Sequence, residues 1–295
     1  MKRSKIKRFV LKSFINFFNK ESVVEILMEN KASRDMIMQR GFVFYDFASN
    51  FPLKISDKKL KNKALKNTNS IAKNFDAQLS FSQTGEDLIV DFIFKAMGVS
   101  RPTYIDIGAF DPIKLSNTAL FYLNGSRGIT VEPNPLNFSR FIENRPEDIN
   151  LNVGVSDIVG EIDYYMFDAP TLNTCSKEES EIFQRGGDHK IIDTIKVKSD
   201  TLKNIVKNNC DGIFPDFLSL DAEGADKIVL QAIDYEKNYP KVICLETISF
   251  SDRISFSKED AATKDDKIIN FLLSKGYVLF ADTYINTIFV KKNCF

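Results

Sequence analysis

Side chains that bind metals or form disulfides are scarce in this chain of 295 residues. Trp is absent, His occurs once, and the four Cys residues are widely spaced, at Cys175, Cys210, Cys244 and Cys294. A zinc site needs Cys and His ligands at short spacings, so none is expected. Unclustered Cys is typical of a reducing compartment, which predicts a cytoplasmic protein.

Long apolar runs are missing as well. No stretch is long and apolar enough to form a membrane-spanning helix. The basic start of the chain, residues 1–5, is similar to the first part of a signal peptide. Polar residues interrupt the segment that follows, however, and it has no small-residue cleavage site. We therefore expect neither a transmembrane helix nor a cleaved signal.

Charge is balanced over the whole chain but unevenly placed along it. Residues 1–80 hold 17 basic and 7 acidic side chains, whereas the rest holds 23 basic and 33 acidic ones. A basic arm predicts an anionic neighbour, such as a membrane surface or a partner protein. Nucleic acid is not an expected partner, because the acidic majority would repel its phosphates and no nucleic-acid motif is present.

Residues 1–75 are predicted to form a basic, mainly helical extension. Within it, residues 5–18 repeat apolar side chains at helical spacing, with Lys and Arg largely outside that stripe. Such a helix suits docking on the inner face of a membrane or on a partner. A helix packed on the core with a solvated basic face is the more common outcome of the same pattern.

Residues 76–295 alternate strands and helices. Strands are predicted at 104–107, 128–131, 149–155, 161–167, 217–220, 242–245, 277–281 and 286–291. Helices are predicted at 88–97, 116–123, 135–144, 202–208, 227–233 and 264–275. This order predicts a mostly parallel sheet covered on both faces, closed by an antiparallel hairpin. We expect 161–167 to pair with 149–155, and the irregular segment 168–190 to form a lid.

Acidic residues stand at the ends of four predicted strands. They are Asp106, Glu132, Asp221 and Glu246. Ligands of open parallel sheets bind beyond the carboxyl ends of the strands, so these acids predict a polar crevice there. The alternative is that they cap the helices that follow.

The loop after the first strand contains one glycine, Gly108, between Asp106 and Asp111. A dinucleotide-binding loop needs three glycines, and flanking acids repel a diphosphate, which disfavours a nicotinamide-dependent oxidoreductase. A sulfonium nucleoside with an amino-acid tail is a better electrostatic match. Glu132 follows Gly108 by 24 residues, at the end of the second strand, where a carboxylate binds ribose hydroxyls.

Several motifs in register identify a family resemblance. They are Ser82–Asp87, Tyr104–Pro112, Ser116–Thr118, Phe121–Tyr122, Gly128–Pro135, Asn152–Ser156 and Leu218–Gly224. Over roughly residues 80–290 the chain resembles the FkbM family of S-adenosylmethionine-dependent methyltransferases. The resemblance implies a Rossmann-like α/β fold with a seven-stranded, mostly parallel sheet and an antiparallel C-terminal strand. It also implies S-adenosyl-L-methionine as cofactor.

The resemblance also implies roles for individual residues. Asp106, Gly108 and Asn117 would line the methionine end of the cofactor, and Glu132 would hold the ribose. Ser156 and Asp157 would lie near the adenine. Gln83 and Glu86 would help to close the site. The turn that contains Asp221 and Glu223 would face the transferred methyl group.

An alcohol acceptor needs a base to remove its proton as the methyl group arrives. Asp221 and Glu223 are candidates by position. His189 has a suitable unperturbed pKa, although a lone His is more often a plain surface residue. A divalent cation between Asp221 and Glu246 is a weaker alternative, because the sequence offers no full set of ligands.

The function expected from these features is methylation of a hydroxyl on a sugar, glycan or glycolipid. A non-catalytic cofactor- or sugar-nucleotide-binding module of an envelope glycan assembly is the alternative, since a fold by itself does not fix an activity.

Overall fold

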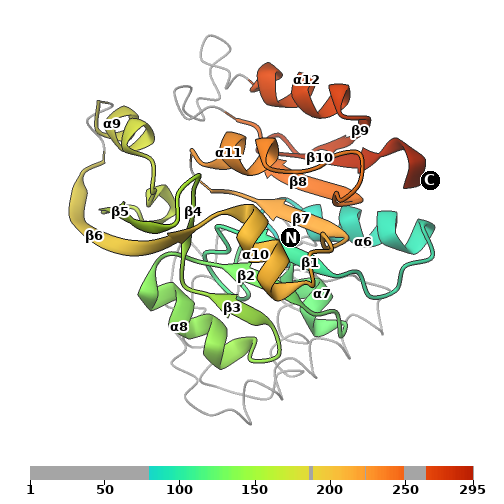
Figure 1. The fold of residues 1–295 in the computed structure, drawn as a ribbon, viewed down its shortest axis with the longest axis horizontal. Coiled ribbons are helices and arrows are strands. Elements are labelled where there is room, and N and C mark those ends of the chain that lie inside the picture. The colour runs from blue at the N-terminus through green and yellow to red at the C-terminus, as the bar shows by residue number, and fades with distance from the viewer. Residues whose placement is uncertain (1–79, 186–188, 223, 249–263, 295) are drawn as a thin grey trace, which may run out of the picture. The chain divides into compact units, whose positions relative to one another are not determined.

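The computed structural model describes residues 80–185, 189–222, 224–248 and 264–294 (Figure 1). The predictions for the basic extension, residues 1–75, and for Glu223 lie outside these ranges. Within them, no helix is long and apolar enough to cross a membrane.

A seven-stranded sheet forms the centre of the fold, in the order β3-β2-β1-β7-β8-β10-β9. Its strands are β1 (Tyr104–Ile107), β2 (Gly128–Val131), β3 (Ile149–Leu151), β7 (Phe217–Leu220), β8 (Val242–Glu246), β9 (Tyr277–Asp282) and β10 (Asn286–Lys291). The first five in spatial order are parallel, and β10 runs antiparallel to both of its neighbours. The predicted Rossmann-like α/β fold with an antiparallel C-terminal strand is confirmed.

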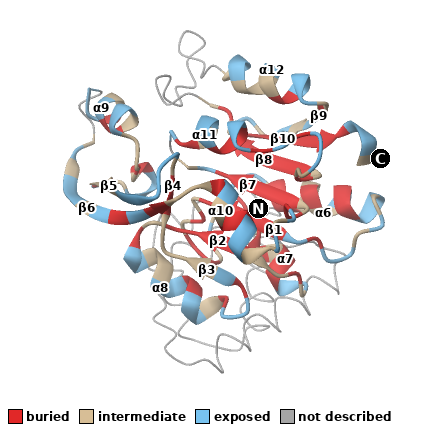
Figure 2. Cartoon of the chain, in the orientation of Figure 1, coloured by how far each residue is buried: buried red, intermediate tan, exposed pale blue. Residues whose placement is uncertain are grey.

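Helices cover the sheet on both faces (Figures 1 and 2). They are α6 (Glu86–Ala96), α7 (Ala119–Leu123), α8 (Pro135–Asn144), α9 (Lys177–Arg185), α10 (Leu202–Asn209), α11 (Asp226–Gln231) and α12 (Asp266–Ser274). Two short 3-10 helices, η1 (Pro170–Leu172) and η2 (Lys292–Cys294), complete the description.

Successive side chains of the central strands point to opposite faces of the sheet and so contribute to two cores. Ile105 and Ile107 of β1 face a core closed by α10, α11 and α12, whereas Tyr104 faces a second core closed by α6 and α7. Every residue of β1, β7 and β10 is buried, because both faces of these strands are covered (Figure 2).

Local sequence signals fix several helix starts. The Asn134 side chain accepts a hydrogen bond from the Leu136 backbone N–H at 3.0 Å, and Pro135 occupies the first turn of α8. Thr201 caps α10 in the same way. Asp265 accepts two backbone N–H groups at the start of α12. These caps explain why the predicted and observed starts of the three helices agree to within two residues.

A second, three-stranded sheet lies beside the main one (Figure 1). It consists of β4 (Gly154–Val155), β6 (Ile191–Asp200) and β5 (Gly160–Phe167), in that order. The prediction of one strand over 149–155 was wrong, because β3 joins the main sheet and β4 the small one. The predicted pairing of 161–167 was also wrong, since β5 pairs with β6 instead.

The segment predicted to be irregular, 168–190, contains more structure than expected. Within its described part, η1 and α9 are both helical, and Phe167, Leu172 and Phe183 form a small apolar core. Phe167 and Phe183 meet edge to face, with ring centroids 5.6 Å apart. This core fixes η1 and α9 against the small sheet.

Candidate active site

A cavity of about 950 Å³ opens at the carboxyl ends of the parallel strands. Pairing aligns Ile107 of β1 with Val131 of β2 and Leu220 of β7, and Leu220 with Leu245 of β8. The residues that follow these partners therefore come together at one edge of the sheet. The chain crosses from β3 back to β7 here, so the cavity lies at the point where the strand order reverses.

Gly108 allows two strand ends to approach closely. Its φ is +76°, a left-handed conformation that favours glycine, and a Cβ built on it would lie 1.7 Å from the backbone oxygen of Asp221. The Gly108 N–H donates to the Val131 carbonyl, and the Asp221 N–H donates to the Ile107 carbonyl. Both bonds hold the turn against β2 and β7, so only glycine fits this position.

Asp106 is a buried carboxylate at the cavity wall, 4% exposed. Thr118 donates to its Oδ2 at 2.5 Å, and a hydrogen bond from Ser219 on neighbouring β7 reaches it as well. Burial raises the pKa of Asp106, while the charge of Arg145 and these two hydrogen bonds oppose the rise. The carboxylate is therefore held from behind by protein donors and presented to the cavity.

Glu132 lies in the same cavity as Asp106. Its two oxygens accept the backbone N–H groups of Phe110 and Asn134, both at 2.8 Å. Burial raises the pKa of Glu132 to about 7; the N–H donors oppose this rise and the charge of Asp106 adds to it. The two acids that the sequence predicted to converge do share one pocket.

Asp221 and Glu246 form a second acidic pair at this edge of the sheet. Both line the cavity, and their side chains hydrogen-bond to each other. Burial, the largest cause, together with the charge of Asp226 raises the pKa of Asp221 to about 7. The same causes, with Asp221 itself, raise that of Glu246 to about 10.

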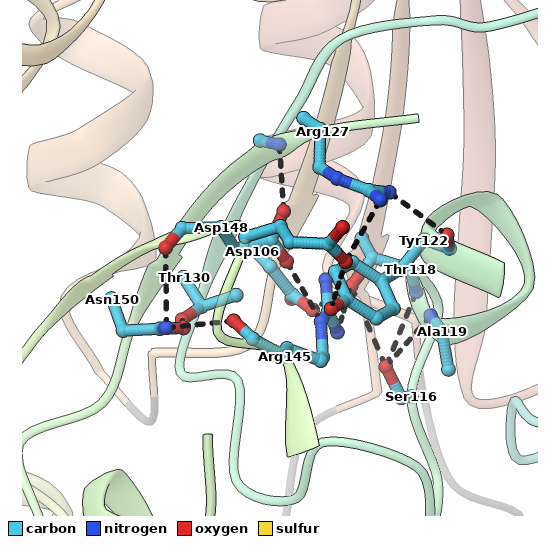
Figure 3. Close-up of polar contacts among 12 residues, drawn as sticks. Asp106, Ser116, Thr118, Ala119, Tyr122, Arg127, Thr130, Arg145, Asp148 and Asn150 are labelled. Carbon is cyan, nitrogen blue, oxygen red and sulfur yellow. Dashed lines mark hydrogen bonds and ion pairs between the residues drawn. The ribbon is translucent and has the colours of Figure 1, made fainter. Parts of the chain in front are cut away.

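A buried guanidinium supports Asp106 from behind (Figure 3). Arg145, at the end of α8, is fully buried and donates from Nε to Asp148 at 2.8 Å and from a terminal nitrogen to the Thr118 hydroxyl at 3.0 Å. Another nitrogen reaches the Tyr104 hydroxyl at 2.9 Å. Since Thr118 donates onward to Asp106, one chain of hydrogen bonds connects α8 to the cavity wall.

The opposite wall comes from the small sheet, η1 and α9. It contains Tyr164, Leu172, Asn173, Thr174, Cys175 and Phe183. This wall combines apolar side chains with hydroxyl and amide groups. Because the first wall belongs to the main sheet, the cavity lies between two sheets and has room for more than one small ligand.

Two further residues proposed for the cofactor site line the cavity. Gln83 is exposed there, and the Asn117 amide donates to the Ser219 hydroxyl at 3.3 Å. Glu86 lies behind the wall instead. It accepts hydrogen bonds from Thr283 at 2.7 Å and Asn286 at 2.9 Å. Burial raises the pKa of Glu86, but hydrogen bonds from Thr84, Thr283 and Asn286 outweigh it and lower the pKa overall.

Of the remaining predicted residues, Ser156 and Asp157 lie just beyond the cavity lining, His189 is part of it, and Glu223 lies outside the described residues. Ser156 and Asp157 form a turn beyond β4, where the Ser156 hydroxyl donates to the Ile158 carbonyl at 2.8 Å; the cavity lining includes residues 153–155 just before them. His189 lines the cavity and lies 3.4 Å from Asp168 through its Nδ1. Glu223 falls outside the described residues, so its place in the site stays a prediction.

Sequence reasoning missed some residues of the site. Ser219 contacts both Asp106 and Asn117, and Asn286 of β10 reaches the cavity from the far end of the chain. No signal in the sequence indicated that Arg145 is buried, because an Arg at the end of an amphipathic helix is usually solvated. The alternation of apolar and charged residues in 191–200 did offer a signal for β6, and with it for the second wall.

The match to a family model agrees with this geometry. Residues 106–279, more than half of the chain, match the model described as the methyltransferase FkbM domain. The chain belongs to the FkbM methyltransferase family. The resemblance read from the motifs is thereby confirmed, and with it the assignment as an S-adenosylmethionine-dependent methyltransferase.

Among the solved structures that match the chain is a TehB-like SAM-dependent methyltransferase from Corynebacterium glutamicum. It is 11% identical in sequence, and the alignment covers 79% of the FkbM-family chain and 97% of the other, with a TM-score of 0.34. Among curated proteins, none matches the sequence significantly.

Proposed function

We propose that this FkbM-family methyltransferase binds S-adenosyl-L-methionine between Asp106 and Glu132, and methylates a hydroxyl group of a sugar, glycan or glycolipid. The convergence of four carboxyl groups on one cavity at the switch point of the sheet is the observation that carries the proposal. Such a cavity suits a ligand that brings positive charge and many hydroxyl groups.

The cofactor half of the site fits the chemistry of a sulfonium nucleoside. Asp106, with Gly108 and Asn117 beside it, meets the amino-acid end, whose ammonium group pairs with a carboxylate. Glu132 keeps lone pairs toward the cavity after accepting two N–H groups, and these accept the ribose hydroxyls. The adenine occupies the end of the cavity near residues 153–155, next to Ser156 and Asp157. Gln83 helps to close the site from the cavity itself, and Glu86 does so from behind the wall, through the hydrogen bond that Asn286 donates to it.

The chemistry asks little of the protein, since the bound cofactor supplies a methyl group already activated on a sulfonium sulfur. Residues of the chain must hold the acceptor oxygen in line with that methyl group, and orientation of this kind supplies about 7–11 kcal/mol in favourable cases. Asp221 takes the proton from the acceptor hydroxyl as the new bond forms. A pKa of about 7 suits a base that works near neutral pH. Glu223 and His189 are the other candidates for this role.

The acceptor half of the site fits a neutral, hydroxyl-rich molecule. Tyr164, Asn173 and Thr174 offer hydroxyl and amide groups, and Leu172 and Phe183 offer apolar faces. Sugar rings present hydroxyls at their edges and C–H groups on their faces, which this mixture matches. The acidic surplus in the cavity disfavours an anionic acceptor. The basic segment at residues 1–80 is proposed to bring the enzyme to an anionic membrane surface in the cytoplasm, where lipid-linked glycans are found.

Two measurements test this function. Isothermal titration with S-adenosylmethionine should give saturable binding at one site. A transfer assay with cofactor labelled in the methyl group, against glycans and glycolipids extracted from the source cell, should then identify the acceptor by the label it acquires. A chain that binds no S-adenosylmethionine contradicts the proposal at its first step, and a labelled amine or peptide would contradict the acceptor class.

A further inference from the structure

The strand register places Asp221 and Glu246 side by side. Leu220 and Leu245 are partners in the parallel pairing of β7 and β8, and each acid is the next residue along the chain. Both side chains line the cavity, and they hydrogen-bond to each other. Of these two residues, only Asp221 was expected in a catalytic role, so Glu246 needs an explanation of its own.

Two carboxyl groups in hydrogen-bond contact must share a proton, because two carboxylates have no hydrogen to place between them and repel each other strongly. The other charged groups that act on this pair within the described residues are also acids. Asp226 of α11 faces both members, Asp106 of β1 faces Asp221, and Glu179 of α9 faces Glu246. This concentration of negative charge favours retention of the proton.

The two members of the pair are not equivalent. Burial comes first among the causes that raise both pKa values, and the rise is the larger at Glu246, where the charges of Asp221, Asp226 and Glu179 add to it. The proton that the pair shares is therefore assigned to Glu246, and Asp221 is the member that ionises. The hydrogen bond from Glu246 in turn lowers the pKa of Asp221.

We propose that Glu246 is a positioning residue whose carboxyl group stays protonated and donates the hydrogen bond that orients Asp221 toward the acceptor hydroxyl. This rests on the proposed role of Asp221 as base. The bond occupies one oxygen of Asp221 and leaves the other free to face the acceptor. As the methyl group passes to the acceptor oxygen, the methyl–sulfur bond would break and leave its electron pair on a neutral thioether, and the acceptor's proton would move to that free oxygen of Asp221. The pair then holds two protons, of which Asp221 releases one to water in the cavity.

Infrared difference spectroscopy on the full chain at about pH 8.5 tests the protonation directly. The wild-type protein should show a carbonyl band of a protonated carboxyl group that Glu246→Gln removes. Glu147→Gln is the control, because Glu147 is exposed and its pKa is lowered by hydrogen bonds from Tyr122 and Arg127, so no such band should be lost. In wild-type protein labelled with ¹³C in the Glu carboxyl groups, the same band should shift, and this second measurement does not depend on the fold of a variant.

The positioning role is tested by the titration midpoint of Asp221, followed by ¹³C NMR of Asp-labelled protein and assigned with Asp221→Asn. Glu246→Gln keeps a donor and should leave the midpoint near that of the wild type. Glu246→Ala removes the donor and should move it to higher pH. Identical midpoints in all three proteins, or a wild-type spectrum without the Glu band, overturn the proposal.

Two further measurements distinguish this inference from the proposed function and from a cation site. Titration with S-adenosylmethionine should give the same affinity for the wild type and Glu246→Gln; if the wild type does not bind, the proposed function fails while the infrared result still decides the state of Glu246. Added Mg²⁺ should leave the protonated-carboxyl band unchanged. Loss of the band on adding Mg²⁺ would make the pair a cation site and overturn the inference.

Discussion

At the scale of single residues, the Glu132 carboxylate accepts N–H groups from Phe110 and Asn134. These two hydrogen bonds fix the orientation of the carboxylate. We expect Glu132→Ala to weaken S-adenosylmethionine binding about tenfold to a hundredfold, since a hydrogen bond to a charged group is worth about 1.5–3 kcal/mol. Calorimetric titration measures the change. Glu143→Ala, at an exposed position of α8, should bind as the wild type does, and unchanged affinity in Glu132→Ala would refute its ribose-binding role.

Asp221 should affect the reaction more than the binding of the cofactor. Asp221→Asn keeps the shape of the side chain but removes its basicity, so we expect turnover to fall about a hundredfold to ten-thousandfold, the range for general-base catalysis. Affinity for S-adenosylmethionine should change little by comparison. Both quantities come from the transfer assay and the titration already described. Equal losses in turnover and affinity would indicate a binding role instead.

At the scale of secondary-structure elements, the tight turn after β1 depends on Gly108. An alanine in the left-handed backbone conformation ordinarily costs about 1–2 kcal/mol of stability. We expect Gly108→Ala to destabilise the fold by several times that amount. Its Cβ would overlap the Asp221 backbone oxygen. Gly98→Ala is the matched control, because Gly98 has a φ of +74° and nothing within 4 Å of an added Cβ. Urea unfolding of both variants measures the difference, and equal losses would mean that the turn can relax.

The hydrogen-bond chain from α8 to β1 is the second element-scale feature. Arg145→Met leaves Asp148 buried without its cationic partner, and breaking a buried pair costs about 3–5 kcal/mol. Arg185→Met is the control, because Arg185 is 76% exposed and pairs with the half-exposed Glu181, and a surface pair contributes about 1 kcal/mol or less. Free energies of unfolding in denaturant measure both. A loss in Arg145→Met as small as that of the control would mean that water or repacking compensates the buried Asp148.

Strands and helices of the main sheet were predictable because their local signals agree with their tertiary surroundings. Buried runs such as 104–107 and 217–220 are short and apolar, and caps such as Asn134 and Thr201 mark the helix starts. The small sheet was not predictable to the same degree. Glu161–Phe167 had two possible partners, and local sequence does not choose between them, since strand pairing depends on contacts far apart in the chain.

At the scale of the whole molecule, stability should fall as pH rises through the neutral range. Glu132 and Asp221 have folded-state pKa values raised to about 7, so the folded protein keeps protons that the unfolded chain releases near pH 4–5. Because the native state then binds more protons, the free energy of unfolding decreases between about pH 4.5 and 7. The raised pKa of Glu132 alone corresponds to about 3 kcal/mol.

Denaturant unfolding at pH 5 and pH 8 checks this expectation. Glu132→Gln should flatten the dependence by removing one of the titrating groups. Saturating S-adenosylmethionine should raise the melting temperature more at pH 8 than at pH 5, because a cationic ligand favours the ionised acids. A wild-type protein whose stability rises over this range would show that these carboxyl groups are ionised in the folded state.

The sequence predicted the strand-end wall of the site residue by residue, and the opposite wall only as an irregular lid over 168–190. Asp106, Glu132, Asp221 and Glu246 stand at strand ends, and the parallel-sheet rule brings such residues together without further information. Tyr164 and Phe183 reach the cavity only because β5 pairs with β6 and α9 packs back on them. Their place follows from tertiary contacts that no local motif encodes.

Each wall of the cavity thus has its own architectural support. The chain leaves the large sheet after β3, passes the residues proposed to bind the adenine, builds β5, η1, α9 and β6, and returns at α10, so residues 160–200 form one continuous stretch. An exchange of that single stretch between relatives, by recombination or by design, would replace the surface that meets the acceptor and leave the strand ends beneath the cofactor in place. Diversification of acceptors within one scaffold then requires a change in only one contiguous region of the gene.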